Sequence, residues 1–290
     1  MSLTLLQAWQ SAKTRLEAAG LTGPVIDARL LVEAAAEATR ADIVTDPYRA
    51  LTPEQEERLA DYLGRRERRQ PVSHILGRKG FWKIMLSVTP DVLTPRPDTE
   101  VIVDYVLKKF LDEAAAFQIL DLGVGSGAIV LSILAERRNA RGLATDISDE
   151  ALAVARENAA NLGLAPQLAF SRGNWTEGLA DASFDVVVSN PPYIASDVIE
   201  TLDPEVKDHE PRLALDGGAD GLDAYRHLAP EILRVLKPGG VFAVEIGYDQ
   251  KDAVEALFND AGASDVWTIK DLSTHDRVVV GVKNPLETGD

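Results

Sequence analysis

Residues 117–148 read "FQILDLGVGSGAIVLSILAERRNARGLATDIS", and their pattern indicates the fold. An apolar run ends at Asp121 and passes into a turn that contains three glycines. An apolar helical period follows, and a second apolar run ends at Asp146. A strand, a turn, a helix and another strand in this order form one β–α–β unit of a parallel sheet. Glycines in the turn allow backbone N–H groups to approach a ligand before the helix begins.

The same alternation of strand and helix continues over residues 98–290. Helical periods separate seven apolar runs that are expected to be strands, at 117–123, 142–148, 168–173, 184–190, 239–247, 265–272 and 277–283. Such alternation predicts an α/β domain with a mostly parallel, Rossmann-like sheet and helices on both faces. The last two runs are joined by a short polar connection, so one of them is expected to be antiparallel.

The first 80 residues have a different, all-helical pattern. Apolar residues recur at helix spacing up to Gly20, Pro24 opens a second run, and Thr52 begins a third with the arrangement of a capping box. Residues 1–80 carry a net charge of +1 against −17 for the rest. They predict a small helical domain, followed over residues 81–97 by a β-hairpin and a proline-punctuated linker.

The third helix of this region ends in "RRERR", residues 65–69. These side chains could face an acidic partner. A solvated helix face is the interpretation we favour, since runs of charge on helices usually face water.

Composition excludes several classes of protein. The chain has 290 residues, 46% of them hydrophobic, as expected for a globular protein with a proper core. A net charge of −16 argues against broad binding to a phosphate backbone, so no stable nucleic-acid partner is expected. Cysteine is absent, the four histidines show no metal-ligand spacing, and no stretch approaches a membrane span, so we expect a cytoplasmic protein without a metal site.

Polar residues that follow three successive strands predict a cofactor pocket. The glycine spacing at 123–127 lacks the pattern of dinucleotide folds and the lysine of a P-loop, so phosphate is not the obvious ligand. Asp146 can accept hydrogen bonds from two ribose hydroxyls, although a purely structural acid at a helix start is the alternative. Asn174 and Trp175 could address an adenine edge and face. The pattern suits an adenosine without phosphates, and S-adenosylmethionine fits it.

The fourth strand ends in "VVVSNPPYIA", residues 186–195. Proline lacks the N–H that a sheet needs, so the strand stops in a rigid segment with free carbonyl groups. The side-chain oxygen of Asn190 and the main-chain oxygen of Pro191 could hold both N–H bonds of a planar amino group, with Tyr193 stacked against it. We therefore predict methylation of an amino group conjugated to a carbonyl or to an aromatic ring.

The longer motifs resemble those of one family. "QPVSHILGRKGFW", "LTPRPDTEVIV", "DLGVGSGAI", "SNPPYI", "HEPRLALDGGADGLDAYR" and "DLSTHDRVVVG" together are similar to the HemK-type glutamine methyltransferases that modify peptide chain release factors. The resemblance runs from about residue 3 to residue 283. It implies a class I methyltransferase domain at 98–290 and a helical domain at 1–80 that docks the substrate. It also implies S-adenosylmethionine as methyl donor, S-adenosylhomocysteine as product, and the glutamine of the Gly-Gly-Gln loop of a class I release factor as acceptor.

By position, the resemblance assigns roles to individual residues. The catalytic residues are expected to be Asn190, Pro191 and Tyr193. Those that bind the glutamine are expected to be Asn190, Pro191, Pro192 and Tyr193. Those that bind the cofactor are expected to be Gly123, Val124, Gly125, Ser126, Gly127, Asp146, Asn174, Trp175 and Asn190. The chain departs from the family pattern at Thr274, where glycine is frequent, and at Asn174, where aspartate is common. A monomer is expected.

Some alternatives stay open at this point. A ribosomal protein could supply the glutamine, the acceptor could be an exocyclic amine of adenine or cytosine, or the fold could serve as a nucleoside sensor without activity. In "RPDTE", Pro97 and Asp98 suit a helix start, whereas Arg96 and Glu100 could close the cofactor pocket. Residues 210–218 are expected to shape the mouth of the substrate site.

Overall fold

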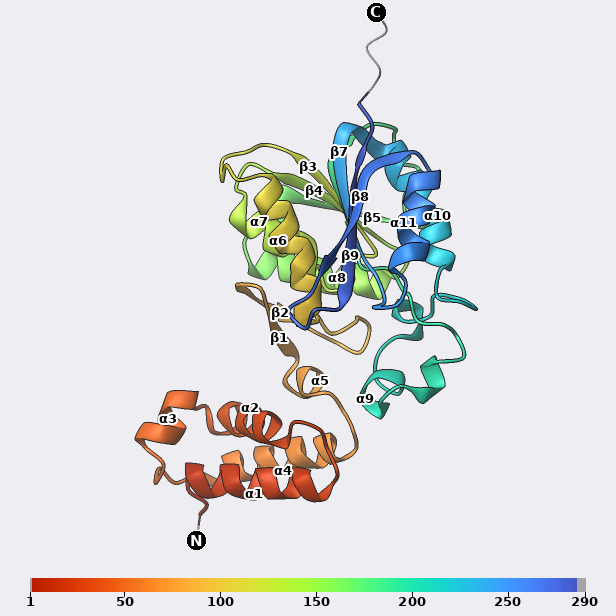
Figure 1. The fold of residues 1–290 in the computed structure, drawn as a ribbon. Coiled ribbons are helices and arrows are strands. Elements are labelled where there is room, and N and C mark those ends of the chain that lie inside the picture. The colour runs from red at the N-terminus through yellow and green to blue at the C-terminus, as the bar shows by residue number, and fades with distance from the viewer. Residues whose placement is uncertain (1, 286–290) are drawn as a thin grey trace, which may run out of the picture. The chain divides into compact units, whose positions relative to one another are not determined.

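The computed structural model describes residues 2–285 and packs into two compact units. The helical unit comprises the chain up to Arg78 together with Asp203–His209, and the α/β unit comprises Lys79–Leu202 and the residues from Glu210 onward. In Figure 1 the chain up to Arg78 is red to orange, the segment Asp203–His209 is teal, and the α/β unit runs from orange through green to blue.

The helical unit is built from α1 to α5 and the short α9. Their bounds are Leu5–Ala18, Pro24–Ala36, Arg40–Thr45, Pro53–Glu67, Val72–Leu76 and, for α9, Pro204–Lys207. Thr52 caps α4 as predicted, with Pro53 at the first helical position and Gln55 completing the capping box. The sequence pattern missed α3, whose six residues are too few to show a period, although Thr39 and Asp42 form a second capping box there.

The expected solvated face at residues 65–69 is wrong for Arg66. This side chain is only 5% exposed, and it donates to Asp27 Oδ2 at 2.7 Å and to Glu205 Oε1 at 2.9 Å. Arg69 also reaches Glu205, at 3.3 Å. A guanidinium can be buried here because two carboxylates from distant parts of the chain accept its hydrogen bonds.

The α/β unit contains the predicted seven-stranded sheet, in the order β5-β4-β3-β6-β7-β9-β8. Its pairs are parallel from β5 through β7, and β9 runs antiparallel to both neighbours, which confirms the prediction of one reversed strand. The bounds of β3 to β9 are Gln118–Leu122, Arg141–Asp146, Leu168–Arg172, Phe184–Ser189, Leu236–Glu245, Ala263–Lys270 and Asp276–Lys283. Chain order reverses between β3 and β6, which makes their carboxyl ends a topological switch point.

Helices cover both faces of this sheet, as Figure 1 shows. The apolar sides of α6 (Glu100–Lys109), α7 (Ala128–Glu136) and α8 (Asp149–Asn161) pack in one core cluster with residues such as Ile119 of β3. On the other face, α10 (Asp223–Val235) and α11 (Lys251–Asp260) pack with residues such as Leu120. Adjacent residues of one strand thus enter opposite cores, as the strand period requires.

A hairpin of β1 (Arg78–Phe81) and β2 (Ile84–Ser87) precedes the sheet. Phe81 and Leu86 are buried in the core of the α/β unit, and the main-chain N–H of Ser87 donates to Asn158 of α8 at 2.7 Å. The hairpin is therefore part of that unit's packing. Among residues 2–285, no helix combines the length and the apolar character needed to cross a membrane.

Candidate active site

A pocket of about 270 Å³ lies at the switch point, beyond the carboxyl ends of β3, β4, β5 and β6. The predicted site residues that line it are Gly123, Val124, Gly125, Ser126, Asp146, Asn174, Trp175, Asn190 and Pro192. Residues of the linker, such as Arg96 and Thr99, and the segment 211–214 complete the wall. Gly127, Pro191 and Tyr193 are not part of the lining.

The glycine turn brings the backbone to the wall of the pocket, and the N–H groups of its glycines are used within the protein. Gly123, Gly125 and Gly127 all have positive φ, at 73°, 52° and 85°. A side chain at Gly127 would meet Leu131 of α7 at 2.7 Å, so its role is close packing. The N–H groups of Gly123, Val124, Gly125 and Gly127 are bonded within the protein, at 2.8–3.0 Å. A phosphate group would need free N–H donors, so such a turn suits a ligand that has no phosphate.

Asp146, at the end of β4, lies beside this turn. Its Oδ2 accepts from the N–H of Gly125, and its Oδ1 accepts from the N–H of Ser148, both at 3.0 Å. A carboxylate has lone pairs for further bonds, so Asp146 can still accept from hydroxyl groups of a ligand. The alternative role, an acid at the start of α8, is filled by Asp149, and Ser148 caps that helix.

A second acid, Asp121 of β3, lies below the turn. It is buried, accepts from the N–H of Val130 at 3.2 Å, and its Oδ1 has no hydrogen-bond partner among residues 2–285. Burial raises the pKa of Asp121 to about 7, with the nearby charge of Asp146 contributing to the rise and the N–H of Val130 opposing it. Two carboxyl groups thus meet at adjacent strand ends, where they favour a cationic ligand.

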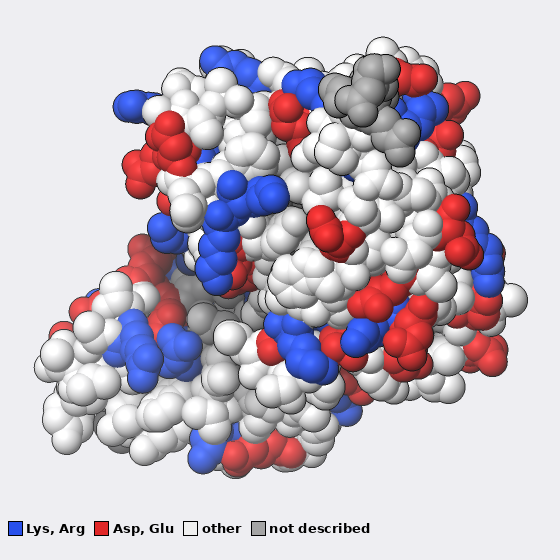
Figure 2. Space-filling model, turned by 45° about the horizontal axis from the view of Figure 1, so that its top comes forward, with Lys and Arg blue, Asp and Glu red and all other residues white. Residues whose placement is uncertain are grey.

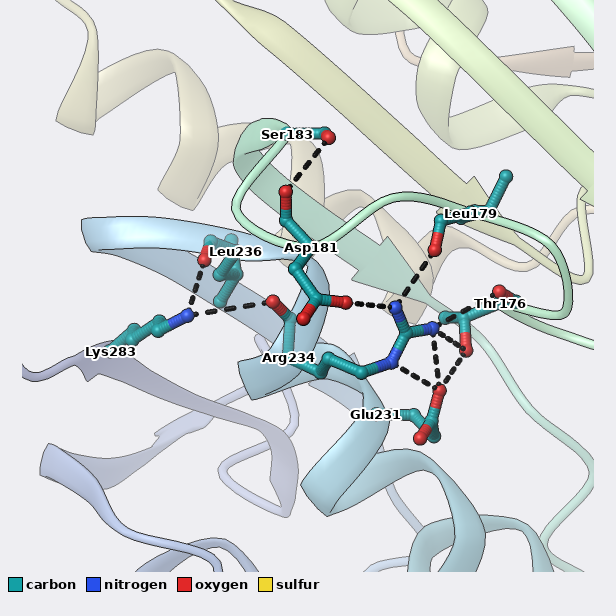
Figure 3. Close-up of polar contacts among 8 residues, drawn as sticks. All are labelled: Thr176, Leu179, Asp181, Ser183, Glu231, Arg234, Leu236 and Lys283. Atoms are coloured by element: carbon teal, nitrogen blue, oxygen red, sulfur yellow. Dashed lines mark hydrogen bonds and ion pairs between the residues drawn. The ribbon is translucent and has the colours of Figure 1, made fainter.

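The loop after β5 holds Trp175 against the turn. Trp175 has a φ of 58°, a strained value for a residue with a side chain, and an added Cβ on Gly123 would lie 3.3 Å from its ring. Figure 3 shows how the next residues are tied to α10: the Thr176 hydroxyl donates to Glu231 at 2.6 Å, and Arg234 donates to Glu231 at 2.8 Å and to the Leu179 carbonyl at 2.8 Å. These hydrogen bonds therefore hold the backbone of Trp175 in its strained conformation.

The Asn-Pro-Pro-Tyr segment continues β6 at the opposite wall. Asn190 is half-buried, and its Nδ2 donates to the Thr99 hydroxyl at 3.3 Å. Pro191 is buried, and the Tyr193 hydroxyl donates to Glu245 Oε1 at 3.1 Å. Burial raises the pKa of Tyr193, so its hydroxyl stays protonated and donates.

Residues 210–218 run beside this segment. At the bridge between Ile194 and Asp216, the N–H of Ile194 donates to the Leu215 carbonyl at 3.0 Å and the N–H of Gly217 donates to the Ile194 carbonyl at 2.8 Å. A side chain at Gly217 would meet the Cα of Tyr193 at 2.8 Å. Glycine is required there by the close approach of the two chains.

Of the two residues of the linker motif "RPDTE" that could close the pocket, only Arg96 lines it. Arg96 lines the pocket and donates to the buried Glu210 at 2.7 Å. Glu100 is outside the lining and accepts from the N–H of Trp82 at 2.8 Å, so it supports the hairpin.

Sequence reasoning missed Thr99 and Glu245. Thr99 is 3% exposed and Glu245 is 1% exposed, and both contact the Asn-Pro-Pro-Tyr segment. An acid that ends the apolar run "VFAVE" is the same signal that singled out Asp121 and Asp146, so Glu245 could have been found.

The charges of the pocket test its fit to S-adenosylmethionine. Its lining includes two acids, Asp91 and Asp146, and one cation, Arg96, which is paired with Glu210. A mainly apolar site with surplus negative charge suits an adenosine carrying a sulfonium, and the residues present fit that group. Within residues 2–285, no cluster of three acids or histidines is arranged to hold a metal ion.

Comparison with known proteins agrees with this architecture. Two family models match, the PrmC N-terminal domain over residues 7–77 and a methyltransferase domain over residues 113–274. The release factor glutamine methyltransferase of Caulobacter vibrioides is 69% identical and covers 99% of both chains. That of Agrobacterium fabrum is 43% identical over 93% of this chain and 94% of its own. A solved methyltransferase from Pyrococcus furiosus shares the fold, with a TM-score of 0.52 and 22% identity over 69% of this chain and 88% of that one.

The sheet order, the pocket at its switch point and the match to a methyltransferase domain define an enzyme of the class I methyltransferases. More narrowly, the chain belongs to the release factor glutamine methyltransferase family. The family resemblance seen in the sequence motifs is thereby confirmed.

Proposed function

We propose that this protein transfers the methyl group of S-adenosylmethionine to the side-chain amide nitrogen of the glutamine in the Gly-Gly-Gln motif of class I peptide chain release factors. The observation that carries the proposal is the Asn-Pro-Pro-Tyr segment, which ends β6 with Asn190 on the wall of a pocket suited to an adenosine sulfonium. The names of the relatives at 69% and 43% identity support the substrate.

S-adenosylmethionine supplies an electrophilic methyl group on a positively charged sulfur. Asp146 would accept from the ribose hydroxyls and Trp175 would lie against the adenine. Gly123, Val124, Gly125 and Ser126 would border the rest of the molecule, with Gly127 packing their turn against α7. Asn174 follows β5 at the same edge and offers an amide to the adenine. Each residue acts by binding or orientation, which is how a pre-organised site lowers the barrier to displacement.

The residues of the Asn-Pro-Pro-Tyr segment would orient the acceptor. An amide nitrogen is a poor nucleophile because its lone pair is delocalised into the carbonyl group. Acceptance of its two N–H bonds by Asn190 Oδ1 and the Pro191 carbonyl would direct the lone pair toward the methyl carbon and stabilise the positive charge that develops on nitrogen. Pro192 lines the pocket, and the ring of Tyr193 would wall in the planar amide.

The helical unit would dock the release factor, and the enzyme would act as a monomer in the cytoplasm, where release factors work. A nucleic-acid substrate is less well supported by charge. The chain has a net charge of −16, and on the face drawn in Figure 2 basic and acidic side chains are interspersed. Binding along a phosphate backbone draws its affinity from clustered cations.

The direct test is incubation of the full-length protein with S-adenosylmethionine and a class I release factor, followed by intact mass measurement and peptide mapping. We expect one added methyl group, on the glutamine of the Gly-Gly-Gln loop. A release factor with that glutamine changed to glutamate is the matched control. Methylation of a ribosomal protein or of an oligonucleotide, with none on the release factor, would reject the proposal.

A further inference from the structure

Glu245 ends β7 directly behind the Asn-Pro-Pro-Tyr segment. It is 1% exposed, its Oε1 accepts from the Tyr193 hydroxyl, and its Oε2 has no hydrogen-bond partner among residues 2–285. The Tyr225 hydroxyl donates to the main-chain carbonyl of Glu245 at 2.8 Å and not to its carboxylate. A buried carboxylate with an unpaired oxygen is unfavourable for folding. Its presence therefore indicates a role in function.

Thr99 connects this carboxylate with Asn190. Its hydroxyl accepts from Asn190 Nδ2 at 3.3 Å and borders the pocket. Hydrogen bonding from Thr99 is also among the causes that lower the pKa of Glu245, which places these two side chains close together. One chain of polar contacts thus joins Asn190, which directly follows β6, to Thr99 in η1 (Pro97–Thr99) and to Glu245 at the end of β7.

The carboxylate of Glu245 determines which groups donate and which accept in these polar contacts. An ionised carboxylate only accepts, so the single hydrogen of the Thr99 hydroxyl is drawn to Glu245. The hydroxyl oxygen is then left to accept, and it faces the NH₂ group of Asn190. With its NH₂ group committed to Thr99, Asn190 presents its carbonyl oxygen on the other side.

We infer that Glu245 is a positioning residue that sets the amide orientation of Asn190 through Thr99, so that Asn190 offers an acceptor to the N–H of the substrate amide. The inference rests on the proposed function, because it assumes that an amino group is the acceptor of the methyl. In the reverse orientation two NH₂ groups would face each other, and the substrate nitrogen would not be held for displacement.

Protonation of Glu245 would remove the acceptor that fixes this direction. Burial raises the pKa of Glu245 to about 6, opposed by Thr99, Arg277 and Tyr193 and reinforced by the charge of Asp98. The ionisable groups around it are thus Arg277 on β9, Asp98 in η1, Tyr193 after β6 and Tyr225 on α10. The ionised form is the active one, so turnover falls as the pH drops through about 6.

The test compares kcat from pH 5 to pH 8 for the full-length wild type and for Glu245→Gln, Thr99→Val and Thr99→Ser, with a release factor as substrate. Valine keeps the shape of threonine without its hydroxyl, and serine keeps the hydroxyl. We expect Glu245→Gln and Thr99→Val to lower kcat on the order of tenfold, with the affinity for S-adenosylhomocysteine and the melting temperature little changed.

The pH profile separates positioning from a merely structural role. Thr99→Val should lose the fall in kcat below pH 6 although it keeps Glu245, and Thr99→Ser should restore both the rate and the fall. Any titration of the release factor itself is common to all variants and cancels. A Thr99→Val enzyme with the wild-type rate and pH profile would overturn the inference, even if Glu245→Gln fails to fold. A wild type that binds S-adenosylhomocysteine but methylates no release factor would instead reject the proposed function.

Discussion

Asp146 Oδ2 accepts a 3.0 Å hydrogen bond from the main-chain N–H of Gly125, which joins the end of β4 to the turn that follows β3. The acid that is proposed to bind the cofactor thus also fixes the backbone on which the cofactor would lie. Its loss should therefore affect the pocket twice, through a missing acceptor and through a looser turn.

Replacement of Asp146 by alanine should weaken binding of S-adenosylhomocysteine by roughly 1.5–3 kcal/mol, because charge-assisted hydrogen bonds to the ribose are lost. Isothermal titration calorimetry measures the change. Asp149→Ala is the matched control, since this acid starts α8 and pairs with Arg172 at 3.4 Å outside the pocket lining. Unchanged affinity in Asp146→Ala would remove this residue from the site.

Replacement of Asn190 by alanine should lower kcat by about 10²-fold or more, because the acceptor is needed most in the transition state. Affinity for S-adenosylhomocysteine should change little. Asn190→Asp should be about as damaging, since it keeps the acceptor but loses the Nδ2 donor to Thr99 and adds a charge near Glu245. Near-normal kcat with a raised KM in Asn190→Ala would identify a plain binding contact and contradict the positioning role.

Replacement of Arg234 by alanine should act on the cofactor from a distance. The change removes the hydrogen bonds from Arg234 to the carbonyl groups of Thr176 and Leu179, so Trp175 is no longer held in its left-handed conformation. We expect several-fold weaker binding of S-adenosylhomocysteine and a loss of about 1 kcal/mol in the free energy of unfolding, since the side chain is partly exposed.

Arg226→Ala is the control for Arg234, because Arg226 lies on the same helix and pairs with Asp220 and Asp223. Its affinity for S-adenosylhomocysteine should equal that of the wild type. In a Trp175→Ala background, Arg234→Ala should have no further effect on affinity. An additional loss there would mean that Arg234 does not act through Trp175.

Removal of the helical unit should separate cofactor binding from activity on the protein substrate. A fragment that begins at Lys79 keeps the hairpin, whose Phe81 and Leu86 belong to the core of the α/β unit. It should bind S-adenosylhomocysteine, measured by calorimetry, and lose most of its activity on a whole release factor. Full activity of the fragment would refute a docking role for residues 1–80.

The parts of the fold and site that could be predicted depend on local patterns. Asp121, Asp146 and Asn190 each follow an apolar run, and parallel strands bring such residues to one edge of the sheet. The length of the apolar runs and their alternation with helical patterns predicted the seven strands. The short polar connection between the last two runs predicted the antiparallel strand.

What could not be predicted depends on contacts between distant residues. Arg66 is buried because Asp27 and Glu205 accept its hydrogen bonds, 39 and 139 residues away in the chain. Thr99 meets Asn190 across 91 residues, and no periodicity reports such a pair. The sequence also does not reveal that N–H groups of the glycine turn donate to Thr145, Asp146 and Val124, because these bonds depend on the folded backbone.

The helical unit takes its last helix, α9, from residues 204–207, far beyond the end of α5 at Leu76. A ribosome releases the chain from its N-terminus onward, so α1 to α5 emerge while Glu205 has not yet been made. Arg66 then has Asp27 available but not its second described carboxylate. The helical unit therefore reaches its final packing only after β3 to β6 and the Asn-Pro-Pro-Tyr segment of the other unit have been translated, although its first five helices are the first part of the enzyme to be synthesised.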